Sequence, residues 1–184
     1  MLKTIVFGLT LLFILIPASE TPALAQTKLA RPSASFSVEY TYERNTRAEA
    51  LEAYLRKHNS PLAEKADIFV READKNDLDW KFVAAISGVE STFGRAYPEG
   101  TYNAWGWGIY GTNMYGFPSW DEAIATISRE LRERYMNQWG ATDVYQIGRY
   151  YAASPTWASR VTYFMEQIEK FESIHTSSQL PISL

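Results

Sequence analysis

Apolar residues recur every three or four positions along most of the chain from Asn45 onward, the spacing of one face of an amphipathic helix. Each apolar run follows a capping box, a serine–proline pair or a single polar residue that typically begins a helix. These signals are Thr46–Glu49, Ser60-Pro61, Asp79, Ser119–Glu122, Thr142 and Ser154-Pro155. The main stripes are Ala48, Leu51 and Leu55; Leu62, Ala66, Phe69, Val70 and Ala73; Trp120, Ile124, Ile127, Leu131 and Tyr135; and Trp157, Val161, Phe164, Met165, Ile168 and Phe171.

The pattern predicts five or six helices and an all-α domain over residues 45–175. The third helix is expected from Trp80 to about Phe93. Residues 26–44 are polar and are expected to form a linker, in which the alternation from Phe36 to Tyr42 favours at most an edge strand. Residues 176–184 are expected to form a polar tail.

The first 25 residues have the composition of a secretory signal peptide. Lys3 precedes an apolar run over residues 5–16, and Ala23-Leu24-Ala25 resembles a cleavage site. The run is too short for a spanning helix of about 20 residues. We expect cleavage after Ala25 and a secreted protein that begins at Gln26, with a retained membrane anchor as the alternative.

Composition limits the classes of partner. A formal net charge of −3 without a basic tract argues against nucleic acid and against charge-driven binding to membranes. Cysteine is absent, so disulfides are excluded and the domain must rely on its core. The aromatic content of 15% fits either a well-filled core or a surface on which flat sugar rings stack.

The sequence predicts neither a metal nor another cofactor. Residues 106–111 match G-x-G-x-x-G, but an aromatic loop precedes them where the dinucleotide fingerprint requires a strand. The two histidines, His58 and His175, have no partner at the spacing of metal ligands.

Glu90 is an acid at the end of an apolar helix. With Trp80, Val83 and Ser87 it lies on one continuous stripe of that helix. Burial disfavours the charged form of a carboxylate and raises its pKa, so that it can hold a proton near neutral pH and give it to a leaving oxygen. The alternative is a solvated or salt-bridged glutamate at an exposed helix end.

A glycine-rich aromatic loop follows this helix. Residues 102–111 place Trp105, Trp107 and Tyr110 among glycines. Aromatic faces can stack on sugars, and glycine lets backbone approach a ligand closely. The loop therefore favours an acid that protonates a glycosidic oxygen in an aromatic cleft, while a packed cover over the core is the alternative for the two tryptophans.

Three stretches, in this order, resemble motifs of lysozyme-like bacterial wall hydrolases. Glu90–Gly94 resembles the E-S-x-x-G signature of their catalytic acid, and residues 103–108, N-A-W-G-W-G, resemble the glycine-containing stretch that follows it. Residues 151–161, Y-A-A-S-P-T-W-A-S-R-V, are similar to the late Y-A-x-x-P-x-Y-A-x-K-V motif of the glucosaminidase family. That family is also called mannosyl-glycoprotein endo-β-N-acetylglucosaminidase-like. Soluble lytic transglycosylases share the E-S motif.

The resemblance implies a lysozyme-like all-α fold with a small aromatic loop or hairpin lobe. It implies a monomer that cleaves a β-1,4 bond of peptidoglycan glycan strands in the cell wall or periplasm. Glu90 would be the general acid, and Tyr151, or its neighbour Tyr150, would face it across the cleft. The sugar-binding residues would be Ser91, Asn103, Trp105, Trp107 and Tyr110.

The chain departs from the expected pattern in its second acid. A hydrolase usually needs a second carboxylate, but Glu99, Asp121 and Asp143 lie in no matching motif, and Asp121 fits a first-turn helix charge. Ser154 stands where the family often has an acid. A β-N-acetylglucosaminidase is the first expectation, and a lytic transglycosylase that forms anhydro-muramic ends is the second. A non-catalytic glycan-binding domain and a helical interaction module are the alternatives from other classes.

Overall fold

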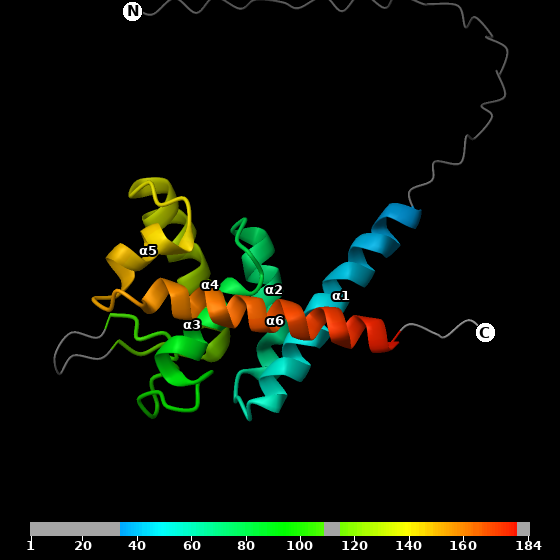
Figure 1. Cartoon of the computed structure of the whole chain (residues 1–184), viewed down its shortest axis with the longest axis horizontal. Helices are drawn as coiled ribbons and strands as arrows, with labels where there is room; N and C mark the ends of the chain where they lie inside the picture. The colour runs from blue at the N-terminus through cyan, green and yellow to red at the C-terminus, as the bar shows by residue number, and fades with distance from the viewer. Residues whose placement is uncertain (1–33, 109–114, 180–184) are drawn as a thin grey trace, which may run out of the picture. The chain divides into compact units, whose positions relative to one another are not determined.

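The computed structural model describes residues 34–108 and 115–179 of the chain, with side chains from Thr46 onward (Figure 1). The expected signal peptide, the first part of the expected linker (residues 26–33) and Tyr110 lie outside these residues. Every regular element in the described part is helical, which confirms the all-α class. None of its helices is both long and apolar enough to span a bilayer. The elements are α1 (Ala34–Lys57), the 3-10 turn η1 (Ala63–Lys65), α2 (Ala66–Lys75), α3 (Phe82–Ser91), α4 (Trp120–Glu130), the π-helix η2 (Leu131–Gln138), α5 (Val144–Tyr151) and α6 (Trp157–Gln179).

The first and last helices are longer than the sequence pattern predicts. α1 begins at Ala34, so the capping box at Thr46–Glu49 lies inside a helix, and the stretch assigned to a linker or an edge strand is helical instead. Residues 34–45 contain neither proline nor glycine, so no helix-breaking residue lies between Ala34 and the capping box at Thr46. α6 continues to Gln179, beyond the expected domain end at residue 175.

The helices from α3 onward begin close to their predicted signals, whereas the α-helix expected at Ser60-Pro61 begins only at Ala66, after η1. Ser119 Oγ accepts a hydrogen bond from the backbone N–H of Glu122 at 3.2 Å, as a capping box requires. Asp143 rather than Thr142 caps α5, because its carboxylate accepts from the backbone N–H of Gln146 at 2.8 Å.

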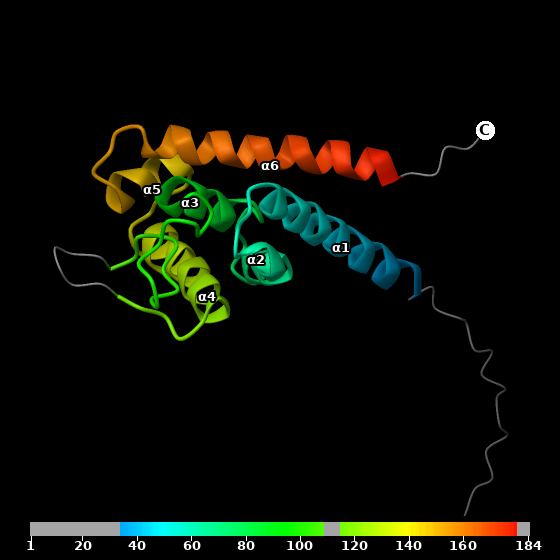
Figure 2. The same cartoon turned by 90° about the horizontal axis from the view of Figure 1, so that it is seen from below.

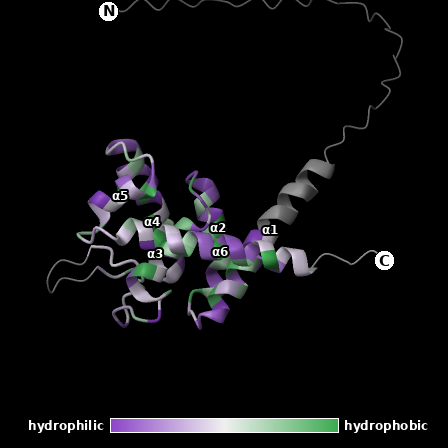
Figure 3. Cartoon of the chain, viewed as in Figure 1, coloured by the Kyte–Doolittle hydropathy of each residue, from purple (hydrophilic) through white to green (hydrophobic). Residues whose placement is uncertain are grey.

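α3 is the buried centre of the domain. α6 packs along both α3 and α1, with hydrophobic and hydrophilic residues alternating along its length (Figures 2 and 3). All residues from Phe82 to Gly88 are buried, and so are Ile124 and Val161 on the neighbouring helices. Burying each large apolar side chain contributes about 1.5–3 kcal/mol. This packing fixes α3 in place, and the orientation of its last turn follows from it.

Candidate active site

Glu90 lies at the rim of the candidate site because α3 ends at the next residue, Ser91. Thr92, Phe93 and Gly94 all have left-handed backbone, with φ of 54°, 58° and 76°. This conformation is uncommon for residues other than glycine, and a bulky buried phenylalanine there is strained. The Ser91 hydroxyl holds the turn by accepting from the backbone N–H of Gly94 at 2.9 Å. The carboxyl of Glu90 therefore sits on a rigid helix end.

Trp157, the first residue of α6, holds one oxygen of that carboxyl. Its indole Nε1–H donates to Glu90 Oε1 at 2.6 Å. Glu90 is exposed as a residue, yet the protein around the carboxyl group displaces enough water that burial raises its pKa. The Trp157 hydrogen bond and the positive charge of Arg160 oppose burial and lower the pKa. Burial is the largest of the three effects, so the pKa of Glu90 lies above its usual value.

Gly106 forms the wall beside the other carboxyl oxygen. A Cβ atom at this position would lie 3.3 Å from Glu90 Oε2, and φ of Gly106 is +64°. Glycine satisfies both the close approach and the left-handed backbone. The aromatic loop thus brings its main chain against the acid, as its glycine content predicts.

Tyr151 supports the site from behind Trp157. The two rings stack with centroids 4.7 Å apart at 23°. Tyr151 was expected to face Glu90 across the cleft, but its hydroxyl donates to the carbonyl of Trp105 at 2.8 Å, and Trp157 makes the hydrogen bond to Glu90. Burial raises the pKa of Tyr151 well above its usual value, and the charged form of Glu90 raises it further. A neutral Tyr151 is a positioning residue for the indole.

Three residues expected to line the sugar sites are structural instead. Trp105, Asn103 and Ser91 are respectively 0%, 1% and 4% exposed. Trp105 Nε1 donates to the carbonyl of Val83 at 2.9 Å, and Ser91 Oγ donates to the carbonyl of Ala104 at 2.8 Å. The Asn103 amide joins the two arms of the loop, as it donates to the carbonyls of Trp107 and Tyr115 at 2.7 and 2.8 Å. These side-chain hydrogen bonds satisfy backbone groups of the described part of the loop.

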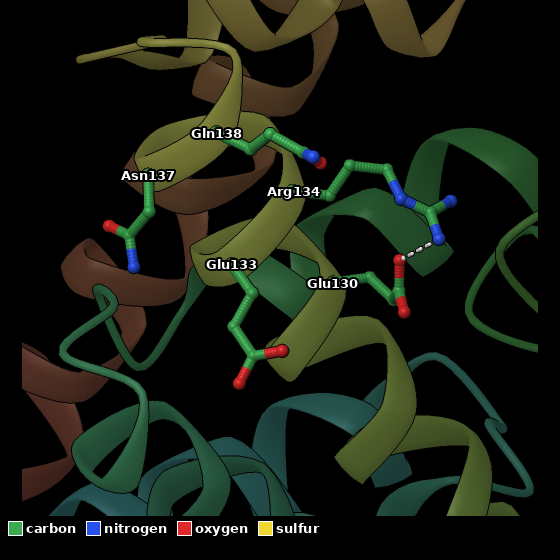
Figure 4. A pocket seen from close by; sticks show the side chains of 5 residues that line it. All are labelled: Glu130, Glu133, Arg134, Asn137 and Gln138. Carbon is green, nitrogen blue, oxygen red and sulfur yellow. Dashed lines mark ion pairs between the residues drawn. The ribbon is translucent and has the colours of Figure 1, made fainter.

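Trp107 is half-buried, so part of its ring remains accessible. Its ring centroid lies 6.3 Å from that of Tyr151. The Arg134 guanidinium lies 5.6 Å from the Trp107 ring centroid, a cation–π distance, and is paired with Glu130 at 2.7 Å (Figure 4). A polar pocket of about 460 Å³ lies at the end of α4 and along the π-helix η2. It is lined by Glu130, Glu133, Arg134, Asn137 and Gln138 (Figure 4).

The candidate second acids have other tasks. Asp121 pairs with Lys65 at 2.7 Å, Asp143 caps α5, and Glu99 is an exposed loop residue. No carboxylate of the described residues is among the groups that shift the pKa of Glu90.

The described residues contain no group of three histidine, cysteine or acidic side chains placed to hold a metal. His58 packs against the rings of Tyr54 and Phe93, at centroid distances of 4.6 and 4.9 Å. His175 stacks on Phe171 at 5.8 Å. Both histidines thus lie in the packing between α1 and α6.

Sequence reasoning missed Trp157 as a site residue and assigned it to the core stripe of the last helix. The late motif contains the signal, since tryptophan stands there where the glucosaminidase family has tyrosine. An indole in a stripe that otherwise needs only apolar surface carries an N–H that must find an acceptor. No protein-family model matches the chain, and no curated protein sequence matches it.

Proposed function

We propose that the protein is an extracytoplasmic peptidoglycan glycosidase that cleaves a β-1,4 bond of the glycan strand, of the β-N-acetylglucosaminidase type, on a lysozyme-like fold. The observation that carries this proposal is the Glu90 carboxyl group, whose pKa burial raises and which accepts a hydrogen bond from the Trp157 indole at 2.6 Å. An acid with a raised pKa at a helix end, beside glycine backbone, is suited to protonating a glycosidic oxygen.

Each carboxyl oxygen has its own part in this reaction. Oε1 accepts from Trp157, so Oε2, beside Gly106, carries the proton. As the glycosidic C–O bond breaks, its electron pair and the Oε2 proton go to the leaving oxygen, and an oxocarbenium-like centre forms on the sugar. The Trp157 N–H then stabilises the carboxylate that remains. Water completes a hydrolysis by adding to the anomeric carbon, and the proton that it loses returns to the Glu90 carboxylate.

The second candidate is a lytic transglycosylase, in which a hydroxyl of the substrate attacks the anomeric carbon in place of water. The structural tasks of Asp121 and Asp143 favour it, because neither is free to activate water. The product is then an anhydro-muramic end. Catalysis by the substrate's own acetamido group instead fits the glucosaminidase.

Mass spectrometry of the soluble products from purified peptidoglycan tests the proposal. Wild type should release fragments, and Glu90→Gln should lower the rate about 10²–10⁴-fold, the range of general acid catalysis. Glu99→Gln, an exposed loop glutamate, is the matched control and should match wild type. Reducing-end N-acetylglucosamine identifies a glucosaminidase, anhydro-muramic ends a transglycosylase, and reducing muramic ends a muramidase. No release by any protein, over several wall types and pH values, would overturn the proposal in favour of a glycan-binding domain.

A further inference from the structure

We propose that Trp139 and Tyr150 form a distal binding platform for the same glycan strand, separate from the acid. The proposal rests on the proposed function, because the platform gains its meaning from a polymer that also reaches Glu90. Its chemical class of ligand is a neutral, extended polysaccharide whose sugar rings present flat faces of C–H groups.

The two side chains form an exposed aromatic pair. Trp139 is 43% exposed and Tyr150 is 55% exposed, and their ring centroids lie 5.1 Å apart. The two rings are tilted by 49° to one another. Exposed tryptophan and tyrosine rings each offer an apolar face with a polar edge, which suits a ligand that is apolar on its faces and hydroxylated at its rim.

The pair is continuous with the candidate active site. The Tyr135 ring lies 4.9 Å from that of Trp139 and 5.8 Å from that of Tyr151, and Tyr135 itself is buried. Tyr151 stacks at 4.7 Å on Trp157, which binds the acid. An unbroken series of ring contacts therefore joins the Glu90 carboxyl to Trp139. We call the exposed pair Trp139 and Tyr150 the distal platform.

The backbone around Trp139 has an unusual conformation that brings the two platform residues together. η2 is a π-helix over eight residues, and such wide turns are rare and occur mainly as short insertions at functional sites. η2 ends at Gln138, and Gly140 turns the chain with φ of +74° toward α5. This turn leaves Trp139 against Tyr150 at the end of α5. An α-helix followed by a longer loop would not bring these rings together.

The position of the platform predicts a dependence on substrate length. Two intervening rings, those of Tyr135 and Tyr151, connect Trp139 to Trp157 in steps of 4.9, 5.8 and 4.7 Å. We therefore expect a short oligosaccharide to occupy only the site at Glu90 and a glycan strand to contact both. The platform therefore contributes to polymer binding and to cleavage within the strand.

The test compares Trp139→Ala and Tyr150→Ala with Tyr145→Ala. Tyr145 lies on the same helix as Tyr150 and is 58% exposed, so it is matched in type, location and exposure. Each substitution is also made with Glu90→Gln, and these proteins are assayed for co-sedimentation with insoluble peptidoglycan. We expect about tenfold weaker binding for each platform variant, the effect of losing one aromatic stacking contact, and unchanged binding for Tyr145→Ala. Trp139→Phe, which keeps a ring, should restore most of the binding.

The active proteins supply a second readout. kcat/KM on peptidoglycan should fall in the platform variants by a similar factor, while kcat/KM on a short soluble chito-oligosaccharide should stay at the wild-type value. Equal loss on both substrates, or binding equal to that of Tyr145→Ala, would overturn the platform. If wild type releases no fragments while the platform variants still lose binding, the glycosidase fails and the platform stands. If wild type neither binds nor cleaves, both fail.

Discussion

Trp105 and Trp157 make the same kind of hydrogen bond in two different regions. Each indole is buried and donates its Nε1–H, Trp105 to the carbonyl of Val83 at 2.9 Å and Trp157 to the Glu90 carboxyl at 2.6 Å. Under the aromatic loop the acceptor is a peptide group, which cannot change its protonation. At the start of α6 the acceptor is a carboxyl group that titrates. The acceptor therefore decides whether a buried indole is a structural anchor or part of a chemical site.

The interior region is expected to carry the larger share of stability. Trp105→Ala should lower the free energy of unfolding by about 3–5 kcal/mol, because it leaves a cavity and removes the indole hydrogen bond to the Val83 carbonyl. Denaturant unfolding measures this loss, with Trp139→Ala, whose ring is partly exposed, as the control that should cost about 0.5–1.5 kcal/mol. A loss at Trp105 no larger than at Trp139 would contradict the assignment of Trp105 to the core.

A substitution at Gly106, beside the Glu90 carboxyl group, should have the next largest effect. Gly106→Ala should cost about 1–2 kcal/mol of stability, since φ of +64° is unfavourable for alanine. Its new methyl group would lie 3.3 Å from Glu90 Oε2, so activity should fall by more than the stability loss explains. Activity measured on fully folded protein checks this. The control is Gly100→Ala, which also has positive φ but has no atom within 4 Å of its Cβ position.

Trp157→Phe separates the ring of Trp157 from its N–H. The stack on Tyr151 can remain, but Glu90 loses the hydrogen bond that lowers its pKa, so that pKa should rise. A general acid is active while protonated and loses activity as the pH rises through its pKa. The alkaline limb of the profile of kcat/KM against pH should therefore move to higher pH. A limb that moves to lower pH would refute the role given to Trp157.

The smallest effect concerns the stability cost of the acid itself. Because the folded-state pKa of Glu90 is raised, its contribution to stability is fully present below the unfolded pKa and is lost as the pH rises through the folded pKa. Glu90→Gln should therefore be slightly more stable than wild type near neutral pH and gain nothing at strongly acidic pH. Thermal unfolding at the two pH values checks the sign, and a gain only at acidic pH would reverse it.

The sequence predicted the helices better than the site. Periodicity placed the stripes of α2, α4 and α6 correctly, because burial of apolar faces dominates both the pattern and the fold. The predicted start of α1 was wrong. The capping box at Thr46 predicts that the helix starts there, but the residues before it contain no helix breaker and the helix begins earlier, at Ala34. Glu90 was identified from its apolar stripe, and its raised pKa agrees.

The partners of Glu90 were harder to predict because they depend on contacts between distant segments. Trp157 lies 67 residues from Glu90 in sequence, and only the packing of α6 on α3 brings them together. The letters N-A-W-G-W-G likewise do not tell which tryptophan is buried. Asn103 decides this, since its carbonyl Oδ1 accepts from the backbone N–H of Trp107 at 3.0 Å and folds the loop over Trp105.

The most direct test of the central claim is a carbon NMR titration of the Glu90 side-chain carboxyl, assigned by comparison with Glu90→Gln. A glutamate in water titrates at about pH 4.3. We predict that Glu90 titrates above this value in wild type and higher still in Trp157→Phe. A midpoint at or below the ordinary value in wild type would mean that burial does not raise the pKa of Glu90, and the proposed general acid would be lost.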